Sequence, residues 1–164
     1  METKTKIIKT AKVCTIVSKV LYLLSCAVCL TFIILAIVLP LTNTLIPDQT
    51  KPETAMTFTT LALYTFVLIG LLWNVEGVFK TIAAEQSPFT DRVSHYLKKV
   101  AIYSVVLSLV PALLGSIILK LVSPESELTF PIHFSGIVAG AVLFLVGLFF
   151  SYGKELQNKD DETL

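Results

Sequence analysis

Four long apolar stretches, separated by shorter polar segments, follow one another along the 164-residue chain. They cover residues 20–39, 56–79, 100–119 and 130–150. A helix of about 20 residues is roughly 30 Å long, which matches the hydrocarbon thickness of a bilayer. The pattern therefore predicts an all-α, polytopic membrane protein in which residues 1–164 form a single domain with four transmembrane helices.

Composition supports a membrane protein and argues against a secreted one. Hydrophobic residues make up 54% of the chain and charged residues only 15%, against roughly 25% in soluble domains. The three cysteines, Cys14, Cys26 and Cys29, lie in or beside the first apolar stretch, and none lies in a polar loop. They therefore indicate no disulfide framework.

The distribution of basic residues predicts the orientation. Cytoplasmic loops of membrane proteins carry an excess of Lys and Arg. If both termini are cytoplasmic, only Lys51 and Lys120 of the 13 Lys and Arg residues lie on the outer side. We therefore expect the N terminus, the C terminus and the segment between the second and third spans to be cytoplasmic.

The segment Ser87–Lys99 is polar but has helical periodicity. Pro88 disfavours helical geometry at the residue before it, so the preceding helix should end there. Thr90 or Ser87 can cap a new helix, and Asp91 is favourable in its first turn. One apolar face then recurs at helical spacing, and basic residues such as Arg92 lie off it. We predict a short amphipathic cytoplasmic helix between spans 2 and 3 that leads directly into the third span.

The N-terminal segment, residues 1–19, is rich in lysine and contains one acid, Glu2. It is consistent with a basic amphipathic helix on an anionic leaflet, or with the polar flank of the first span. Within that span, Cys26 and Cys29 share a helix face. No His, Asp or Glu accompanies them, so we predict packing residues and no metal site.

Ionisable and small residues mark further candidate positions. Glu76 and Lys80 have the i, i+4 spacing of an ion pair, which we predict at the inner interface. Pro111 should kink the third span. Small residues that let helices approach closely are Ser104 and Ser108, with Ala112 and Ser116, in the third span, and Gly136 and Gly140 in the fourth. The Gly136–Gly140 pair fits an internal helix contact or a dimer contact.

No catalytic chemistry is visible in the sequence. It contains no P-loop, no Gly-X-Ser-X-Gly and no His-Glu-X-X-His, and the span centres contain no Asp, Glu, Lys, Arg or His. We therefore expect no enzyme, no catalytic residue, no cofactor and no direct nucleic-acid binding. Ion-coupled transport is disfavoured for the same reason, because such proteins place ionisable groups near the bilayer midplane.

Two motifs carry a resemblance to a known family. The first is Ser87-Pro88-Phe89-Thr90 after Phe79-Lys80-X-Ile82, and the second is the tail Gly153-X-X-Leu156-Gln157-X-X-X-Asp161-Glu162-Thr163. Together they resemble a family of small four-span prokaryotic membrane proteins, catalogued as domain of unknown function, family 2975. The resemblance implies a four-helix protein of the prokaryotic plasma membrane without an assigned activity, of a kind often encoded beside a small Xre-type helix-turn-helix regulator. It also implies a signature whose role is open, at Ser87, Pro88, Phe89, Leu156, Gln157 and Asp161.

Three hypotheses for function follow from these observations. In the first, a regulatory membrane protein holds a cytoplasmic partner, such as that regulator, through residues 89–99 and the acidic tail. In the second, a small-solute transporter or an immunity or stress-tolerance protein uses a cavity beside the Ser104–Ser116 strip. In the third, Phe89 and the tail are folding devices, with tail acids pairing with Lys98 and Lys99. The bilayer and a second copy of the chain are the other candidate partners.

Overall fold

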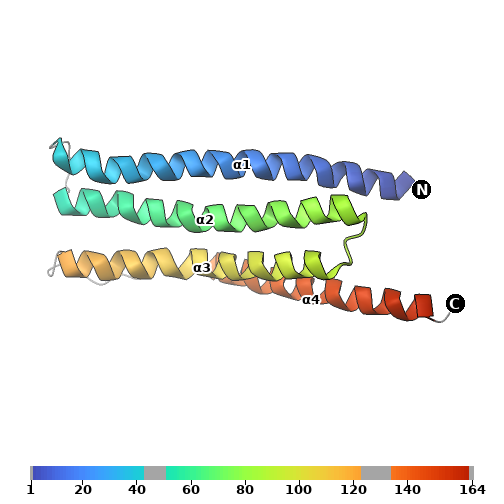
Figure 1. The fold of residues 1–164 in the computed structure, drawn as a ribbon. Coiled ribbons are helices and arrows are strands. Elements are labelled where there is room, and N and C mark those ends of the chain that lie inside the picture. The colour runs from blue at the N-terminus through green and yellow to red at the C-terminus, as the bar shows by residue number, and fades with distance from the viewer. Residues whose placement is uncertain (1, 43–50, 123–133, 163–164) are drawn as a thin grey trace.

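The computed structural model describes residues 2–42, 51–122 and 134–162, and these fold almost entirely into four long helices. They are α1 (Glu2–Leu41), α2 (Lys51–Glu85), α3 (Asp91–Val122) and α4 (Phe134–Glu162), shown in Figure 1. The described ranges contain no strand, so the predicted all-α class is confirmed. The first residues of the predicted fourth span, 130–133, lie outside the described ranges.

The helices form an antiparallel bundle that is left open. Among the described residues, α1 packs only on α2, α2 also packs on α3, and α4 packs only on α3. Figure 1 shows α1, α2 and α3 side by side in chain order, with α4 alongside α3. Both termini and the α2–α3 turn lie at the same end of the molecule. We call this end, formed by residues 5–19, 80–99 and 151–159, the polar end.

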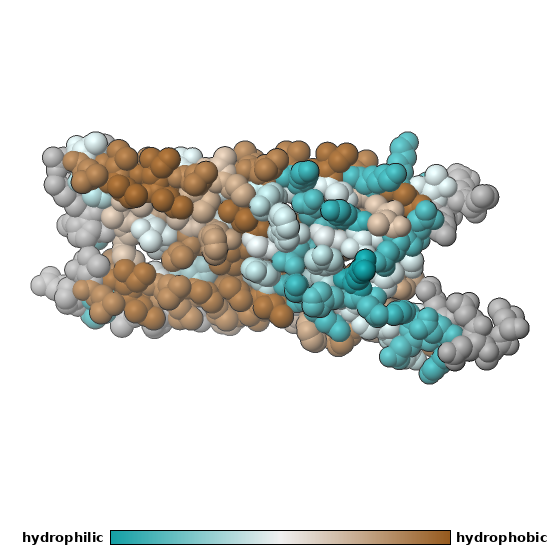
Figure 2. Space-filling view, viewed as in Figure 1, coloured by the Kyte–Doolittle hydropathy of each residue, from teal (hydrophilic) through white to brown (hydrophobic). Residues whose placement is uncertain are grey.

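All four helices are long and apolar enough to cross a membrane, so this is a multi-pass membrane protein. With 40 residues, α1 is roughly 60 Å long, about twice the hydrocarbon thickness. Figure 2 shows where the extra length is polar: hydrophilic residues gather at the polar end, and hydrophobic residues dominate the opposite half. The apolar faces that remain exposed there are the surfaces that lipid would cover.

The basic N-terminal segment continues the first span without a break. Helix α1 begins at Glu2 and passes through Lys19 into the apolar stretch. Of the two interpretations of residues 1–19, the structure therefore shows the in-line polar flank and not a separate helix lying across the membrane surface.

The turn between α2 and α3 agrees with the sequence, but the predicted short helix after it is not a separate element. Helix α2 ends at Glu85, and Gln86 adopts a left-handed backbone conformation with φ of 55°. Thr90 then caps α3, because its Oγ1 accepts a hydrogen bond of 3.3 Å from the amide of Val93. From Asp91 the chain is one continuous helix of 32 residues, so the amphipathic stretch is the beginning of the third span itself. The helix has no break at Lys99–Val100, where the predicted short helix was to end and the third span to begin.

Aromatic and sulfur contacts join α1 to α2. Tyr22 packs edge-on against Trp73, with ring centroids 5.4 Å apart. The buried thiol of Cys29 lies 3.6 Å from the carbonyl of Ala62 and donates a weak hydrogen bond to it. Cys29 therefore packs between helices, as its sequence context predicts.

Tyrosine side chains of α3 pack directly against glycines of α2. A Cβ atom at Gly70 would stand 2.4 Å from Tyr103 Cε1, and one at Gly77 would stand 2.6 Å from Tyr96 Cε1. Both distances are shorter than any normal carbon contact. The two rings therefore lie directly on the backbone of α2, which fixes the rotation of α3 and the faces that it presents to α4 and to its surroundings.

Candidate functional site

The candidate site lies at the polar end, where the α2–α3 turn meets α4. The ring of Phe89 packs edge-on against Phe150, with centroids 5.4 Å apart. It also covers Gly153, where a Cβ atom would stand 2.8 Å from Phe89 Cδ1. The Ser87–Thr90 motif and the start of the tail motif, 64 residues apart from Phe89 to Gly153, are therefore in direct contact.

Two ion pairs flank this contact. Asp91 of α3 pairs with Lys154 of α4, and Arg92 of α3 pairs with Glu85 of α2 at 3.5 Å. The Asp91 and Arg92 side chains are 75% and 79% exposed, so water screens both pairs. Exposed pairs of this kind contribute about 0.2–1 kcal/mol each. They orient the ends of three helices more than they stabilise the fold.

A recess of about 400 Å³ opens between these groups. Its lining consists of Glu85, Phe89, Thr90, Asp91, Arg92 and Lys154. Both ion pairs stand on its rim, so the recess presents adjacent positive and negative charges around one aromatic ring. We call it the turn recess.

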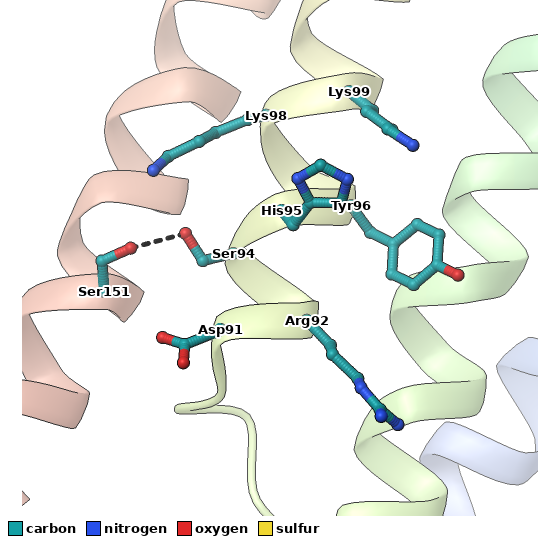
Figure 3. A pocket seen from close by; sticks show the side chains of 8 residues that line it. All are labelled: Asp91, Arg92, Ser94, His95, Tyr96, Lys98, Lys99 and Ser151. Atoms are coloured by element: carbon teal, nitrogen blue, oxygen red, sulfur yellow. Dashed lines mark hydrogen bonds between the residues drawn. The ribbon is translucent and has the colours of Figure 1, made fainter.

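A second, more basic pocket of about 620 Å³ lies next to the turn recess, further along α3. It is lined by Asp91, Arg92, Ser94, His95, Tyr96, Lys98, Lys99 and Ser151, which Figure 3 shows. All of these side chains except that of Ser151 come from the first three turns of α3. We call it the basic pocket.

A buried hydrogen-bond network joins α3 to α4 behind the basic pocket. The hydroxyl of Ser94 donates to the carbonyl of Gly147 at 2.7 Å and lies 2.6 Å from the hydroxyl of Ser151. Ser94 is only 2% exposed. Sequence reasoning missed Ser94, because it lies outside the four-residue spacing of the small-residue strip that begins at Ser104.

The other small residues meet at the same helix pair. Ser104 donates a hydrogen bond of 3.0 Å to the carbonyl of Gly136, and Ser108 donates to the carbonyl of Ser104. A Cβ atom at Gly136 would stand 1.8 Å from Ser108 Oγ, and one at Gly140 would stand 2.8 Å from the carbonyl oxygen of Ala101. The Gly136–Gly140 motif therefore faces α3 of its own chain. Pro111, in the same helix as the serines, is fully buried.

The predicted ion pair between Glu76 and Lys80 is absent from the structure. Among the described residues, neither side chain takes part in an ion pair, and Lys80 is exposed to solvent while Glu76 is half-buried. The physical reason is that a pair at this spacing gains only about 0.3–0.5 kcal/mol, which does not hold a long lysine side chain in one conformation.

The tail residues of the predicted signature are only partly placed. Helix α4 runs to Glu162, so the tail backbone is helical, and Leu156 is 46% exposed. The side chains of Gln157 and Asp161 lie outside the described residues. Within the described residues, the tail contributes Lys154, whose ammonium group pairs with Asp91 of α3. The side chains of the tail acids Asp160, Asp161 and Glu162 lie outside the described residues, so their expected pairing with Lys98 and Lys99 stays a prediction.

An apolar cavity of about 380 Å³ opens further from the polar end, between α2, α3 and α4. Tyr64, Thr65, Leu68, Leu107, Ser108, Ser135 and Gly136 line it. The hydroxyls of Thr65 and Ser108 both donate to carbonyls of their own helices. The cavity therefore offers a solute little hydrogen bonding.

The chain matches no protein-family model, no curated protein and no solved structure.

Proposed function

We propose that the protein is a non-enzymatic, multi-pass protein of the prokaryotic plasma membrane that holds a cytoplasmic partner protein at the membrane. The termini and the α2–α3 turn are cytoplasmic in this proposal, in line with the excess of basic residues on that side. The partner that the motif resemblance suggests is a small helix-turn-helix transcription regulator.

The observation that carries the proposal is the meeting of two distant motifs at the turn recess. Phe89 from the α2–α3 turn and Gly153 from the tail are in contact, and the Asp91–Lys154 pair stands beside them. A purely structural role for the two motifs requires only the buried contact between Phe89 and Gly153. It does not require four charged side chains around the recess, of which Asp91 and Arg92 are largely exposed and available to a polar protein surface.

The length of α4 supplies a second argument. Its apolar stretch ends at Phe150, but the helix continues to Glu162. Twelve further residues of helix extend it by roughly 18 Å beyond the apolar stretch. This extension starts at the turn recess, so a partner can contact the recess and the tail together.

The transport alternative receives less support. A hydrophilic path needs free hydrogen-bonding groups, whereas Ser104, Ser108 and Ser116 donate to helix carbonyls. Ser104 and Ser108 lie against α4. The cavity next to Ser108 is largely apolar.

Membrane retention of the partner tests the proposal. A small helix-turn-helix regulator, of the kind that the motif resemblance implies beside this gene, is fused to a fluorescent protein. It is expressed with the full chain, with Glu85→Lys, and with a chain truncated after Glu155. We expect membrane fluorescence with the full chain and its loss with both variants. Lys12→Gln, on α1 away from the recess, is the matched control and should retain the regulator.

Accumulation of each variant in the membrane separates recognition from folding. Normal accumulation with loss of the regulator supports a binding surface. Equal loss of accumulation and retention supports the folding-device hypothesis instead. A full chain that leaves the regulator in the cytoplasm contradicts the proposal.

A further inference from the structure

We propose that the basic pocket binds the phosphate of an anionic phospholipid headgroup, with Arg92, His95 and Lys99 as the principal contacts. No cytoplasmic partner is needed for this binding. The basic pocket shares Asp91 and Arg92 with the turn recess but extends further along α3, past the α2–α3 turn.

The three residues share one face of α3. Arg92, His95 and Lys99 are spaced by three and four residues, so they lie above one another along the helix. Figure 3 shows Arg92 and Lys99 extending on the side of α2, Lys98 on the side of α4, and His95 between them. Together these donors surround an opening of about 620 Å³, which is large enough for a headgroup phosphate.

The charge of the pocket favours an anion. Asp91 is the only acid in its lining, and Lys154 neutralises it from α4. Lys98 and Lys99 make no ion pair within the described part of the chain. Arg92 pairs with Glu85 only at 3.5 Å and is 79% exposed, so its guanidinium keeps donors that can reach a second acceptor.

The position of the pocket along α3 favours a lipid over a soluble phosphate. The helix face that carries Arg92, His95 and Lys99 continues with exposed apolar side chains at the same spacing. These are Ile102, Val110, Leu113 and Ile117, which are 36% to 58% exposed. Ile102 follows Lys99 by one helical turn. A cationic group followed directly by an apolar surface matches a phospholipid, in which the phosphate is followed by acyl chains.

Neighbouring residues hold the pocket in place. The Ser94–Ser151 and Ser94–Gly147 hydrogen bonds fix α4 beside it, and Tyr96 lies on Gly77 of α2 on its other side. Basic pockets between transmembrane helices at the cytoplasmic side are a known way of binding anionic headgroups. These contacts fix the helix positions from which the donors extend, so less ordering of the protein is needed on binding.

Lipid titration of the purified full chain tests the proposal. Binding of a fluorescent phosphatidylglycerol in detergent micelles is compared with that of the matching phosphatidylcholine. The site variant is Arg92→Gln with Lys99→Gln. The control is Lys9→Gln with Lys12→Gln, which removes the same charge from exposed positions of α1. Each lost charge should weaken binding about fivefold, so we expect a roughly 25-fold loss for the site variant.

The controls make each outcome decisive. Helical content by circular dichroism and elution as a single species show that a variant is folded, and Arg92→Lys with Lys99→Arg should keep most of the binding. Equal weakening by the α1 control, or no preference for phosphatidylglycerol over phosphatidylcholine, overturns the proposal. Displacement of the lipid by millimolar inorganic phosphate assigns the pocket to a soluble phosphate and overturns the lipid assignment.

Discussion

The ring of Phe89 occupies the place where any side chain at residue 153 would begin. A Cβ atom on Gly153 would stand 2.8 Å from Phe89 Cδ1, and Phe150 restrains the ring from another side. The α2–α3 turn and the final turns of α4 are thereby joined by a contact that tolerates glycine only. This contact positions the Asp91–Lys154 pair and the turn recess.

Gly153→Leu should separate α4 from the turn. The new side chain has to displace a ring that is packed against Phe150, and such overpacking costs about 1–3 kcal/mol. We expect a lower midpoint of thermal unfolding in detergent micelles. Asn158→Leu, at an exposed position of the same helix, should leave the midpoint nearly unchanged. Phe89→Ala in the Gly153→Leu background should recover part of the loss, and an additive effect would contradict a direct contact.

The sequence predicted those features of the fold that a distinctive residue type or a long apolar stretch marks. Apolar length defined the four helices, Pro88 and Thr90 marked the turn, and the glycines of α4 marked a helix interface. The amphipathic pattern after Thr90 was correctly assigned to a helix but wrongly separated from the third span. A change from polar to apolar surroundings does not interrupt a helix whose backbone is satisfied throughout.

The order in which the helices pack was not predictable from the sequence. In a membrane, lipid tails are as apolar as Leu, so an apolar stripe does not show which face contacts protein. The open arrangement, in which α1 contacts α2 alone among the described elements, follows from particular close contacts such as Tyr103 on Gly70. Ser94 and Ser151 were missed because single serines carry no signal until the helices are placed side by side.

Gly140→Ala should weaken the α3–α4 interface. The added methyl would stand 2.8 Å from the carbonyl oxygen of Ala101, a backbone atom that cannot move without shifting α3. We expect destabilisation of about 1–3 kcal/mol, measured by denaturant titration in micelles. Ala139→Val adds more atoms one residue away at an exposed position and should have little effect.

The same variant separates an internal contact from a dimer contact. Light scattering of the purified protein should give the same mass for Gly140→Ala and the unmodified chain, because Gly140 faces its own α3. A change from dimer to monomer on this substitution would instead assign Gly136–Gly140 to an interface between two copies.

A cysteine pair at residues 94 and 151 should form a disulfide on mild oxidation. The two hydroxyl oxygens are 2.6 Å apart, so sulfur atoms in their places would lie well inside van der Waals contact and within reach of an S–S bond of about 2.05 Å. The native Cys14, Cys26 and Cys29 are first replaced by Ala. Proteolysis between α3 and α4 followed by non-reducing electrophoresis reports the bond. The pair Ser94→Cys and Asn158→Cys, about two turns further along α4, should remain reduced and cleave into two fragments.

Accessibility of single cysteines should place the polar end in the cytoplasm. Lys9→Cys, Lys99→Cys and Asn158→Cys lie at the polar end, on α1, α3 and α4, whereas Leu121→Cys lies at the opposite end of α3. In a cysteine-free background, a membrane-impermeant maleimide added to intact cells should label only Leu121→Cys. It should label all four in permeabilised cells. The excess of basic residues drives this expectation, because Arg92, Lys98 and Lys99 would otherwise have to cross the bilayer during insertion. Labelling of Lys99→Cys in intact cells would show the opposite topology, with both the turn recess and the basic pocket on the outer face of the membrane.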